Sequence, residues 1–272
     1  VTYDDEFYKS LSSIKQLNDN HLINGTVASF GNFYLFYYYQ QVRPPGVQMD
    51  LKTMDSLAIR RIINENKDNA FLARLAITDK VKSSLAAKTI SFVDKEKTLL
   101  TELYQGSVLK DPIFEAYEKV KTQIDNPQLS EDIKVLTFKS EDAEDYLSEI
   151  IENANGKVIY IDNWATWCAP CRSQFKYHTP EFKKKYGEDV EFVYLCYESK
   201  EAQWKPMIAD YNLTGKHYFI TDSDLHILGK KVRLEGYPTY TIIDKKGKIA
   251  YSGFKYRPSE AITSEVIDEL LK

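Results

Sequence analysis

Residues 161–171 read IDNWATWCAPC, and they join a predicted strand to a predicted helix. The strand covers residues 157–163, which are rich in β-branched and aromatic side chains. Cys168 and Cys171 follow it with two residues between them. A thiolate is the species that attacks a disulfide, and a free cysteine, with a pKa of about 8.5, is mostly protonated at neutral pH. We therefore expect the local structure to lower the pKa of one of these thiols.

The start of the predicted helix supplies such an environment. Unpaired backbone N–H groups and the positive end of the helix dipole stabilise a thiolate there, and C-x-x-C sites span pKa values of roughly 3.5 to 7.5. Cys168 is therefore the predicted nucleophile. Cys171 lies one helical turn further on, close enough to attack a mixed disulfide and release the reduced substrate, so it is the predicted resolving thiol.

The segments around the cysteines alternate between strand and helix patterns. The predicted strands are residues 133–138, 157–163, 190–197, 239–243 and 248–252, and the predicted helices are residues 142–153, the segment from the cysteines to about 186, and 201–211, with short structure near 218–221. A hairpin joins the last two strands. The chain closes with an amphipathic helix whose inner face is Ile262, Val266, Ile267, Leu270 and Leu271. This order implies a mixed central sheet covered by helices on both faces.

The first 124 residues carry a different pattern, in which apolar residues recur at helical spacing. They are Phe7, Leu11 and Ile14, then Leu51, Met54, Ala58 and Ile62, then Ile113, Tyr117, Val120 and Ile124. Asp111 and Pro112 form a start signal for the last of these helices. Polar residues and a proline at 125–131 then mark a boundary. We predict an all-helical domain over 1–124, a linker over 125–132 and an α/β domain over 133–272.

The composition of the chain narrows its function. A net charge of −4 over 272 residues argues against nucleic acid as a partner. Three cysteines are too few for a fold stapled by disulfides. The aromatic-rich run 30–39 is shorter than the roughly 20 apolar residues of a membrane span, so we interpret it as a buried helix. The chain begins at Val1 without an initiator methionine or a signal-peptide core, so we expect an upstream segment, with room for a membrane tether.

The 161–171 stretch resembles the active site of the thioredoxin superfamily. Residues 236–239, read Gly-Tyr-Pro-Thr, resemble the cis-proline segment of that family, and the resemblance covers about residues 133–272. The chain is similar to extracytoplasmic thioredoxin-like thiol-disulfide oxidoreductases related to cytochrome c maturation factors. The similarity lies in the residues around the cysteines, in the inserted helix around Trp204 and in the preceding helical domain. The resemblance implies a C-terminal thioredoxin fold after an all-α domain, and an extracytoplasmic location.

The resemblance also implies roles for the residues around the cysteines. Asp162, six residues before Cys168, matches the buried acid that exchanges a proton with the resolving thiol. Pro238 matches the cis-proline, beside which the backbone of Tyr237 pairs with an extended substrate. Trp164 and Trp167 are expected to wall the site and limit water. Pro170 completes the expected substrate surface, and the Ala-Pro pair at 169–170 differs by one methyl group from the Gly-Pro of reducing sites, which favours a reductase.

The sequence departs from the extracytoplasmic relatives at two positions. Gln174 stands where those relatives often carry a glutamate, and an amide cannot accept the proton, so Asp162 is expected to act alone. Lys176 stands where a proline is usual, and Pro180 comes later. We therefore expect the helix to break near Thr179.

Other functions stay open at this point. A zinc site would need a second pair of ligands, and the histidines His21, His178, His217 and His226 lack ligand spacing. A peroxiredoxin-like thiol peroxidase would need a threonine where Ala165 stands. In a non-catalytic binding or scaffold protein, the cysteine pair would have no role in the function. We favour disulfide exchange with a protein disulfide substrate and a thiol electron donor, without a cofactor. The helical half is expected to orient the substrate or tether the domain, and Cys196 to act as a small buried hydrophobe.

Overall fold

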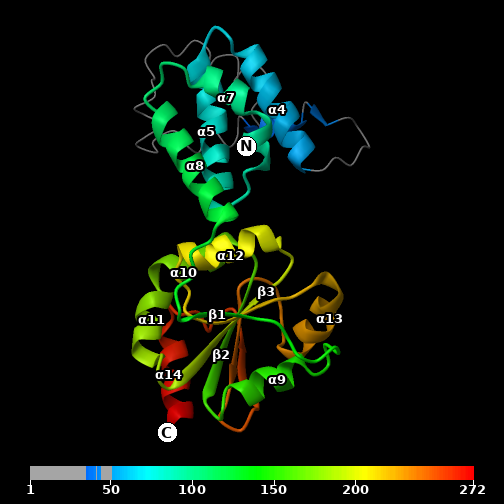
Figure 1. The fold of residues 1–272 in the computed structure, drawn as a ribbon, viewed down its shortest axis with the longest axis vertical. Helices are drawn as coiled ribbons and strands as arrows, with labels where there is room; N and C mark the ends of the chain where they lie inside the picture. The colour runs from blue at the N-terminus through cyan, green and yellow to red at the C-terminus, as the bar shows by residue number, and fades with distance from the viewer. Residues whose placement is uncertain (1–34, 41, 44–50) are drawn as a thin grey trace. The chain divides into compact units, whose positions relative to one another are not determined.

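The computed structural model describes residues 35–40, 42–43 and 51–272. The chain divides into two compact units, one covering residues 1–125 and the other residues 126–272 (Figure 1). The buried apolar side chains of the first unit form one cluster, and those of the second unit form two clusters of their own. Each unit therefore has a separate hydrophobic core.

The described part of the first unit is helical. Its helices are α4 (Leu51–Glu65), α5 (Ala70–Ala86), α6 (Ser91–Lys95), α7 (Lys97–Leu103) and α8 (Lys110–Asp125). Ala58 and Ile62 of α4 and Tyr117 of α8 are buried as their spacing predicts. The helix α8 begins at Lys110, one residue before the predicted cap, and Pro112 lies in its first turn, where its missing N–H breaks no hydrogen bond. The predicted apolar residues Phe7, Leu11 and Ile14 lie outside the described residues.

The aromatic run at residues 30–39 is described only from Leu35 onward. Residues 35–40 are helical, and Leu35 and Tyr38 are buried in the core of the first unit, as the interpretation of a buried helix requires. In the part of the chain that the structure describes, none of the helices combines the length and the apolar character that a membrane crossing needs.

The second unit is built on a six-stranded mixed sheet. Its strands are β1 (Ile133–Leu136), β2 (Val158–Trp164), β3 (Val190–Cys196), β4 (Gly215–Phe219), β5 (Thr239–Ile243) and β6 (Ile249–Gly253), in the order β1-β4-β3-β2-β5-β6. The first four are mutually parallel, β5 runs antiparallel to its neighbour β2, and β6, antiparallel to β5, runs in the direction of the first four. The strand β2 is buried along its whole length, as expected of a strand with neighbours on both sides and helices on both faces.

Helices cover both faces of this sheet (Figure 1). One face, here the α10 face, packs against α10 (Ala169–Tyr177), α11 (Thr179–Tyr186), α12 (Glu201–Asp210) and α14 (Ala261–Leu271). The other, the α9 face, packs against α9 (Tyr146–Asn153) and α13 (Asp222–Lys231). Successive residues of a strand point to opposite faces, so Tyr160 and Trp164 of β2 lie on the α10 face while Ile159 and Ile161 lie on the α9 face. The predicted α/β class with a mixed sheet between helices is confirmed.

Several predicted boundaries are wrong in detail. The strand β1 ends at Leu136 instead of residue 138, and α9 begins at Tyr146 because residues 142–145 form turns. The helix α13 was not predicted, because only Leu228 and Gly229 of its ten residues are buried and its apolar pattern is therefore short. On α14 the predicted inner residue Ile262 is 38% exposed, and Thr263 is buried in its place.

Candidate active site

The cysteine pair lies where β2 passes into α10. The strand ends at Trp164, and α10 begins at Ala169 with Cys168 as its N-cap. The Sγ atom of Cys168 accepts a hydrogen bond of 3.1 Å from the backbone N–H of Cys171, and the two cysteines are joined as a disulfide with their Cα atoms 5.3 Å apart. Pro170 lies in the first turn of α10, where helices tolerate proline. The geometry therefore places the sulfur of Cys168 against the unpaired N–H groups of a helix start.

The pair is recessed between exposed neighbours. Cys168 is only 2% exposed and Cys171 is fully buried, whereas Ala169 and Pro170 between them are exposed. Cys171 is therefore the inner of the two cysteines.

Asp162 lies on β2, on the same face as the cysteine pair. The residue is 1% exposed, and neither carboxylate oxygen has a hydrogen-bond partner among the described residues. Burial raises the pKa of this carboxyl well above its ordinary value, because a charge without partners is costly in a dry interior. Tyr194 of β3 and Tyr240 of β5 are its register partners on either side. Their own pKa values are raised by burial and, to a smaller extent, by the charge of Asp162.

Aromatic side chains form the rim of the site. Trp167 is 57% exposed, and its ring meets that of Tyr237 edge-on, with the centroids 5.5 Å apart. The peptide bond between Tyr237 and Pro238 is cis, and Pro238 is buried. Trp164, in contrast, is fully buried and packs edge-on against Phe175 of α10. Of the two tryptophans, Trp167 therefore lies at the surface of the site and Trp164 lies in the core beneath it.

The loop that follows β3 holds this rim in place, a contact that no sequence motif predicted. The carbonyl oxygen of Glu198 accepts a hydrogen bond of 2.9 Å from Nε1 of Trp167. The carboxylate of the same residue accepts one from the Tyr237 hydroxyl, and burial together with this charge raises the pKa of Tyr237. Glu198 has a φ of +43°, an unusual backbone conformation for a residue other than glycine. Its neighbour Ser199 accepts a hydrogen bond of 2.9 Å from the backbone N–H of Thr166.

Gln174, the departure noted from the sequence, has a structural role. Its Nε2 donates to the hydroxyl of Ser259 over 3.2 Å, and its Oε1 accepts from the backbone N–H of Ser259 over 3.1 Å. Both ends of the amide thus connect α10 to the loop before α14. A carboxylate could accept the second of these bonds but could not donate the first. The predicted break in the helix is also present, because α10 ends at Tyr177 and α11 begins at Thr179.

The third cysteine lies close to the site but is inert. Cys196 is fully buried at the end of β3, where it is the register partner of Trp164. Burial raises the pKa of its thiol to about 12, so it carries no thiolate at neutral pH. Among the residues that the structure describes, no group of three or more His, Cys, Asp or Glu side chains is arranged to hold a metal ion.

Comparison with known protein families agrees with this geometry. Residues 155–249, which include the disulfide, Asp162 and the cis-proline, match the sequence profile of a family described as Thioredoxin-like. This segment is a thioredoxin-like domain. The resemblance predicted from the 161–171 stretch is therefore confirmed, and with it the assignment to thioredoxin-type oxidoreductases.

Three relatives illustrate the similarity of the thioredoxin-like domain. The thioredoxin-like protein YneN of Bacillus subtilis is 27% identical over 140 residues, which cover 50% of this chain and 76% of YneN. The thiol-disulfide oxidoreductase ResA of Bacillus cereus is 28% identical over 36% of this chain and 56% of ResA. The thiol:disulfide interchange protein DsbE of Yersinia pestis is 33% identical over 36% of this chain and 48% of DsbE. The chain thus spans about half the length of ResA and of DsbE.

Proposed function

We propose that this protein is an extracytoplasmic thiol-disulfide oxidoreductase that reduces protein disulfides through Cys168 and Cys171. The observation that carries the proposal is the pairing of these cysteines at the start of α10, on the face of the sheet that holds a buried carboxyl without partners. Sequence similarity to ResA and DsbE supports both the reaction class and the location.

The reaction begins from the reduced protein. The thiolate of Cys168, stabilised by the start of α10, attacks one sulfur of the substrate disulfide. The substrate S–S bond breaks, one substrate thiolate leaves, and Cys168 becomes joined to the other substrate sulfur in a mixed disulfide. Cys171 then attacks the sulfur of Cys168, the Cys168–Cys171 disulfide forms as the mixed disulfide breaks, and the second substrate thiolate leaves. Two electrons have passed to the substrate, and a thiol donor restores the dithiol.

Asp162 supplies the proton transfer for the second step. Cys171 has to lose a proton as it attacks, and a carboxyl with a raised pKa is a suitable acceptor near neutral pH. Gln174 is occupied with Ser259 and cannot take this role. General base catalysis of this kind contributes roughly 10² to 10⁴ in rate, so Asp162→Asn should slow release from the mixed disulfide by at least that lower factor.

The rim of the site fits an extended polypeptide. Trp167, Pro170 and Tyr237 present apolar surface beside Cys168, and the backbone at Tyr237 precedes the cis bond to Pro238. A substrate strand that pairs with the backbone of Tyr237 would bring its own disulfide over Cys168. Protein disulfides in flexible or unfolded segments are therefore the proposed substrates.

The first test is the equilibrium reduction potential of the Cys168–Cys171 pair. Thiol labelling in glutathione or dithiothreitol buffers would measure it, with Cys171→Ser as the variant that cannot close the disulfide. A value at or below about −250 mV supports a reductase that needs an electron donor, and a value of about −120 mV makes the protein an oxidant. Failure to form the intramolecular disulfide in solution would contradict the exchange mechanism.

Turnover of insulin with dithiothreitol is the second test. Cys168→Ser should reduce the rate to that of dithiothreitol alone, because it removes the nucleophile. Cys171→Ser should trap a mixed disulfide that non-reducing gels detect. Cys196→Ala is the matched control, since this buried thiol takes no part, and it should retain the wild-type rate within about twofold. A large loss of rate in Cys196→Ala would indicate that a third thiol takes part in the reaction.

A further inference from the structure

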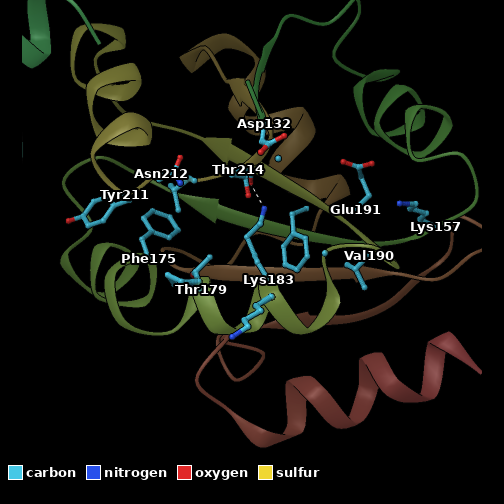
Figure 2. A pocket seen from close by; sticks show the side chains of 16 residues that line it. Asp132, Lys157, Phe175, Thr179, Lys183, Val190, Glu191, Tyr211, Asn212 and Thr214 are labelled. Carbon is cyan, nitrogen blue, oxygen red and sulfur yellow. Dashed lines mark hydrogen bonds between the residues drawn. The ribbon is translucent and has the colours of Figure 1, made fainter. Parts of the chain in front are cut away.

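A cavity lies on the α10 face of the sheet, away from the cysteine pair. Its volume is about 600 Å³, within the range of small-molecule sites. The helix α11 and the strand β3 form two of its sides, and the loop of residues 211–214 with Gly215 at the start of β4 forms another (Figure 2). Its apolar lining includes the rings of Phe175, Phe192 and Tyr211. The cavity therefore offers aromatic surface for the body of a ligand.

Lys183 of α11 extends into this cavity, and its ammonium points toward the loop before β4 (Figure 2). The ammonium donates a hydrogen bond to the carbonyl oxygen of Thr214 and lies 4.4 Å from the centroid of the Phe192 ring. Among the ion pairs of the described residues none includes Lys183, although the nearby charges of Glu191 and Asp132 raise its pKa and partly offset the effect of burial. An ammonium has three N–H donors, and the recorded hydrogen bond uses one of them. Donor capacity therefore remains for a ligand.

Gly215 makes the room for this arrangement. A Cβ atom on Gly215 would lie 2.7 Å from the carbonyl oxygen of Phe192 and 3.2 Å from Nζ of Lys183. The residue also has a φ of +117°, which side chains other than that of glycine rarely allow. The absence of a side chain at this point of β4 thus leaves space next to the cation.

The polar groups of the cavity favour an anionic ligand. The carbonyl of the Asn212 side chain accepts from Ser130 over 3.0 Å, and no hydrogen bond recorded for the described residues uses its Nδ2 group, which can donate. Asp132 and Glu191 also line the cavity, and Glu191 is paired with Lys216 over 3.0 Å. Lys157 and Lys184 line the cavity as well, so its cationic side chains outnumber its carboxylates and an anion is the ligand that this lining attracts.

We propose that this cavity binds a small organic carboxylate, with its anionic group on Lys183 and Asn212 and its apolar body against Phe175 and Phe192. The carboxylate would supply the charge-assisted hydrogen bonds that the ammonium otherwise lacks. Burial lowers the pKa of Lys183 to about 8, and the group is still mostly protonated at pH 7. The inference is independent of disulfide exchange, since Lys183 takes no part in that reaction.

Two probes of the same shape test the proposal on the full chain in its oxidised form. Phenylacetate carries the negative charge, and phenylacetamide is its neutral counterpart. Amide resonances of Thr214, Gly215 and Gly187 would be followed by NMR at pH 7 while each probe is added up to ~50 mM, a range that detects millimolar affinities. Phenylacetate should give saturable shifts at these amides and bind about tenfold more tightly than phenylacetamide, as a charged hydrogen bond in place of a neutral one predicts.

Variants locate the effect at Lys183. Lys183→Met keeps a long apolar side chain, and it should abolish the preference for phenylacetate. Lys185→Met, on the same helix but outside the cavity lining, is the matched control and should keep the preference. The absence of saturation in the wild type, equal affinity for the two probes, or a preference that survives Lys183→Met would each overturn the proposal. If Lys183→Met does not fold, the comparison of probes on the wild type still decides.

Discussion

The two faces of the sheet differ in how their buried polar groups are paired. On the α9 face, Asn163 donates to the carbonyl of Thr239 over 2.8 Å and accepts from the Tyr197 hydroxyl over 3.1 Å. On the α10 face, several buried polar groups have no hydrogen-bond partner among the described residues. They include both oxygens of Asp162, Nε1 of Trp164 and of Trp204, the hydroxyls of Tyr194 and Tyr240, and Nδ1 of His217.

The unpaired polar groups of the α10 face lower the free energy of unfolding of the domain. An unpaired buried polar group costs about 1 to 3 kcal/mol, so folded proteins keep few of them. Asp162 and Asn163 are neighbours on β2, yet one is unpaired and the other is fully paired. The unpaired groups lie on the face that carries the disulfide, which is consistent with a carboxyl kept ready for proton transfer.

The largest expected effect comes from placing a charge on the paired face. Asn163→Asp would set a carboxylate oxygen against the carbonyl of Thr239 and remove the amide donor. Only the Tyr197 hydroxyl would remain to donate to this buried charge, and a buried charge that is not neutralised costs about 3 to 5 kcal/mol, a loss that urea unfolding at pH 8 should register. A loss below about 1 kcal/mol would mean that the two faces are not different in the way described.

Replacing the unpaired carboxyl of Asp162 by a neutral amide should instead raise the free energy of unfolding. The pKa of Asp162 is raised in the folded state, so the folded protein holds this proton more tightly than the unfolded chain, and stability falls as pH rises from about 4 through the folded pKa. Asp162→Asn removes this term. The variant should match the wild type below about pH 4 and gain on it by up to ~1.4 kcal/mol per pH unit above that.

Unfolding of both proteins in urea at pH 4, 6 and 8 measures the effect. A difference that does not change with pH would show that Asp162 titrates normally, and it would remove the physical basis for its role as a base.

Tyr194 lies in β3 and Tyr197 directly follows it, and removing their hydroxyls compares the two faces with a smaller expected loss of stability. Tyr197→Phe removes the hydroxyl that donates to Asn163, and it should cost about 1 to 2 kcal/mol because the amide oxygen loses its partner. Tyr194→Phe removes a hydroxyl without a partner, so stability should stay within about 0.5 kcal/mol or rise. Equal losses in the two variants would indicate that Tyr194 has a partner in solution, such as water.

The smallest expected effect comes from a change at Glu198, which holds the Tyr237 hydroxyl. The side chain of Tyr237 packs against the hydrophobic clusters of both faces. Glu198→Ala removes the carboxylate that accepts from the Tyr237 hydroxyl, which should loosen the rim and raise the KM for insulin about threefold with kcat unchanged. Glu198→Gln keeps an acceptor oxygen and should restore the wild-type KM. A fall in kcat without a change in KM would contradict a role in positioning the rim.

Much of the domain was predictable because its signals are local. The strand before the cysteines, the helix after them and the break near Thr179 all follow from short patterns of apolar residues, proline and glycine. The helix α13 was missed because a helix that buries few residues leaves a weak pattern. The position of Ile262 was predicted incorrectly because apolar spacing alone does not say which edge of the stripe faces the core.

The order of residues alone predicts the chemistry proposed for this protein, since two cysteines at the start of a helix and an acid on the preceding strand can be recognised without coordinates. The tertiary structure decided which polar groups are paired. The contacts of Glu198 with the rim, the amide of Gln174 on Ser259 and the cavity around Lys183 all join residues far apart along the chain. Only a folded sheet brings such residues together, because burial and hydrogen bonding depend on neighbours that the order of residues does not specify.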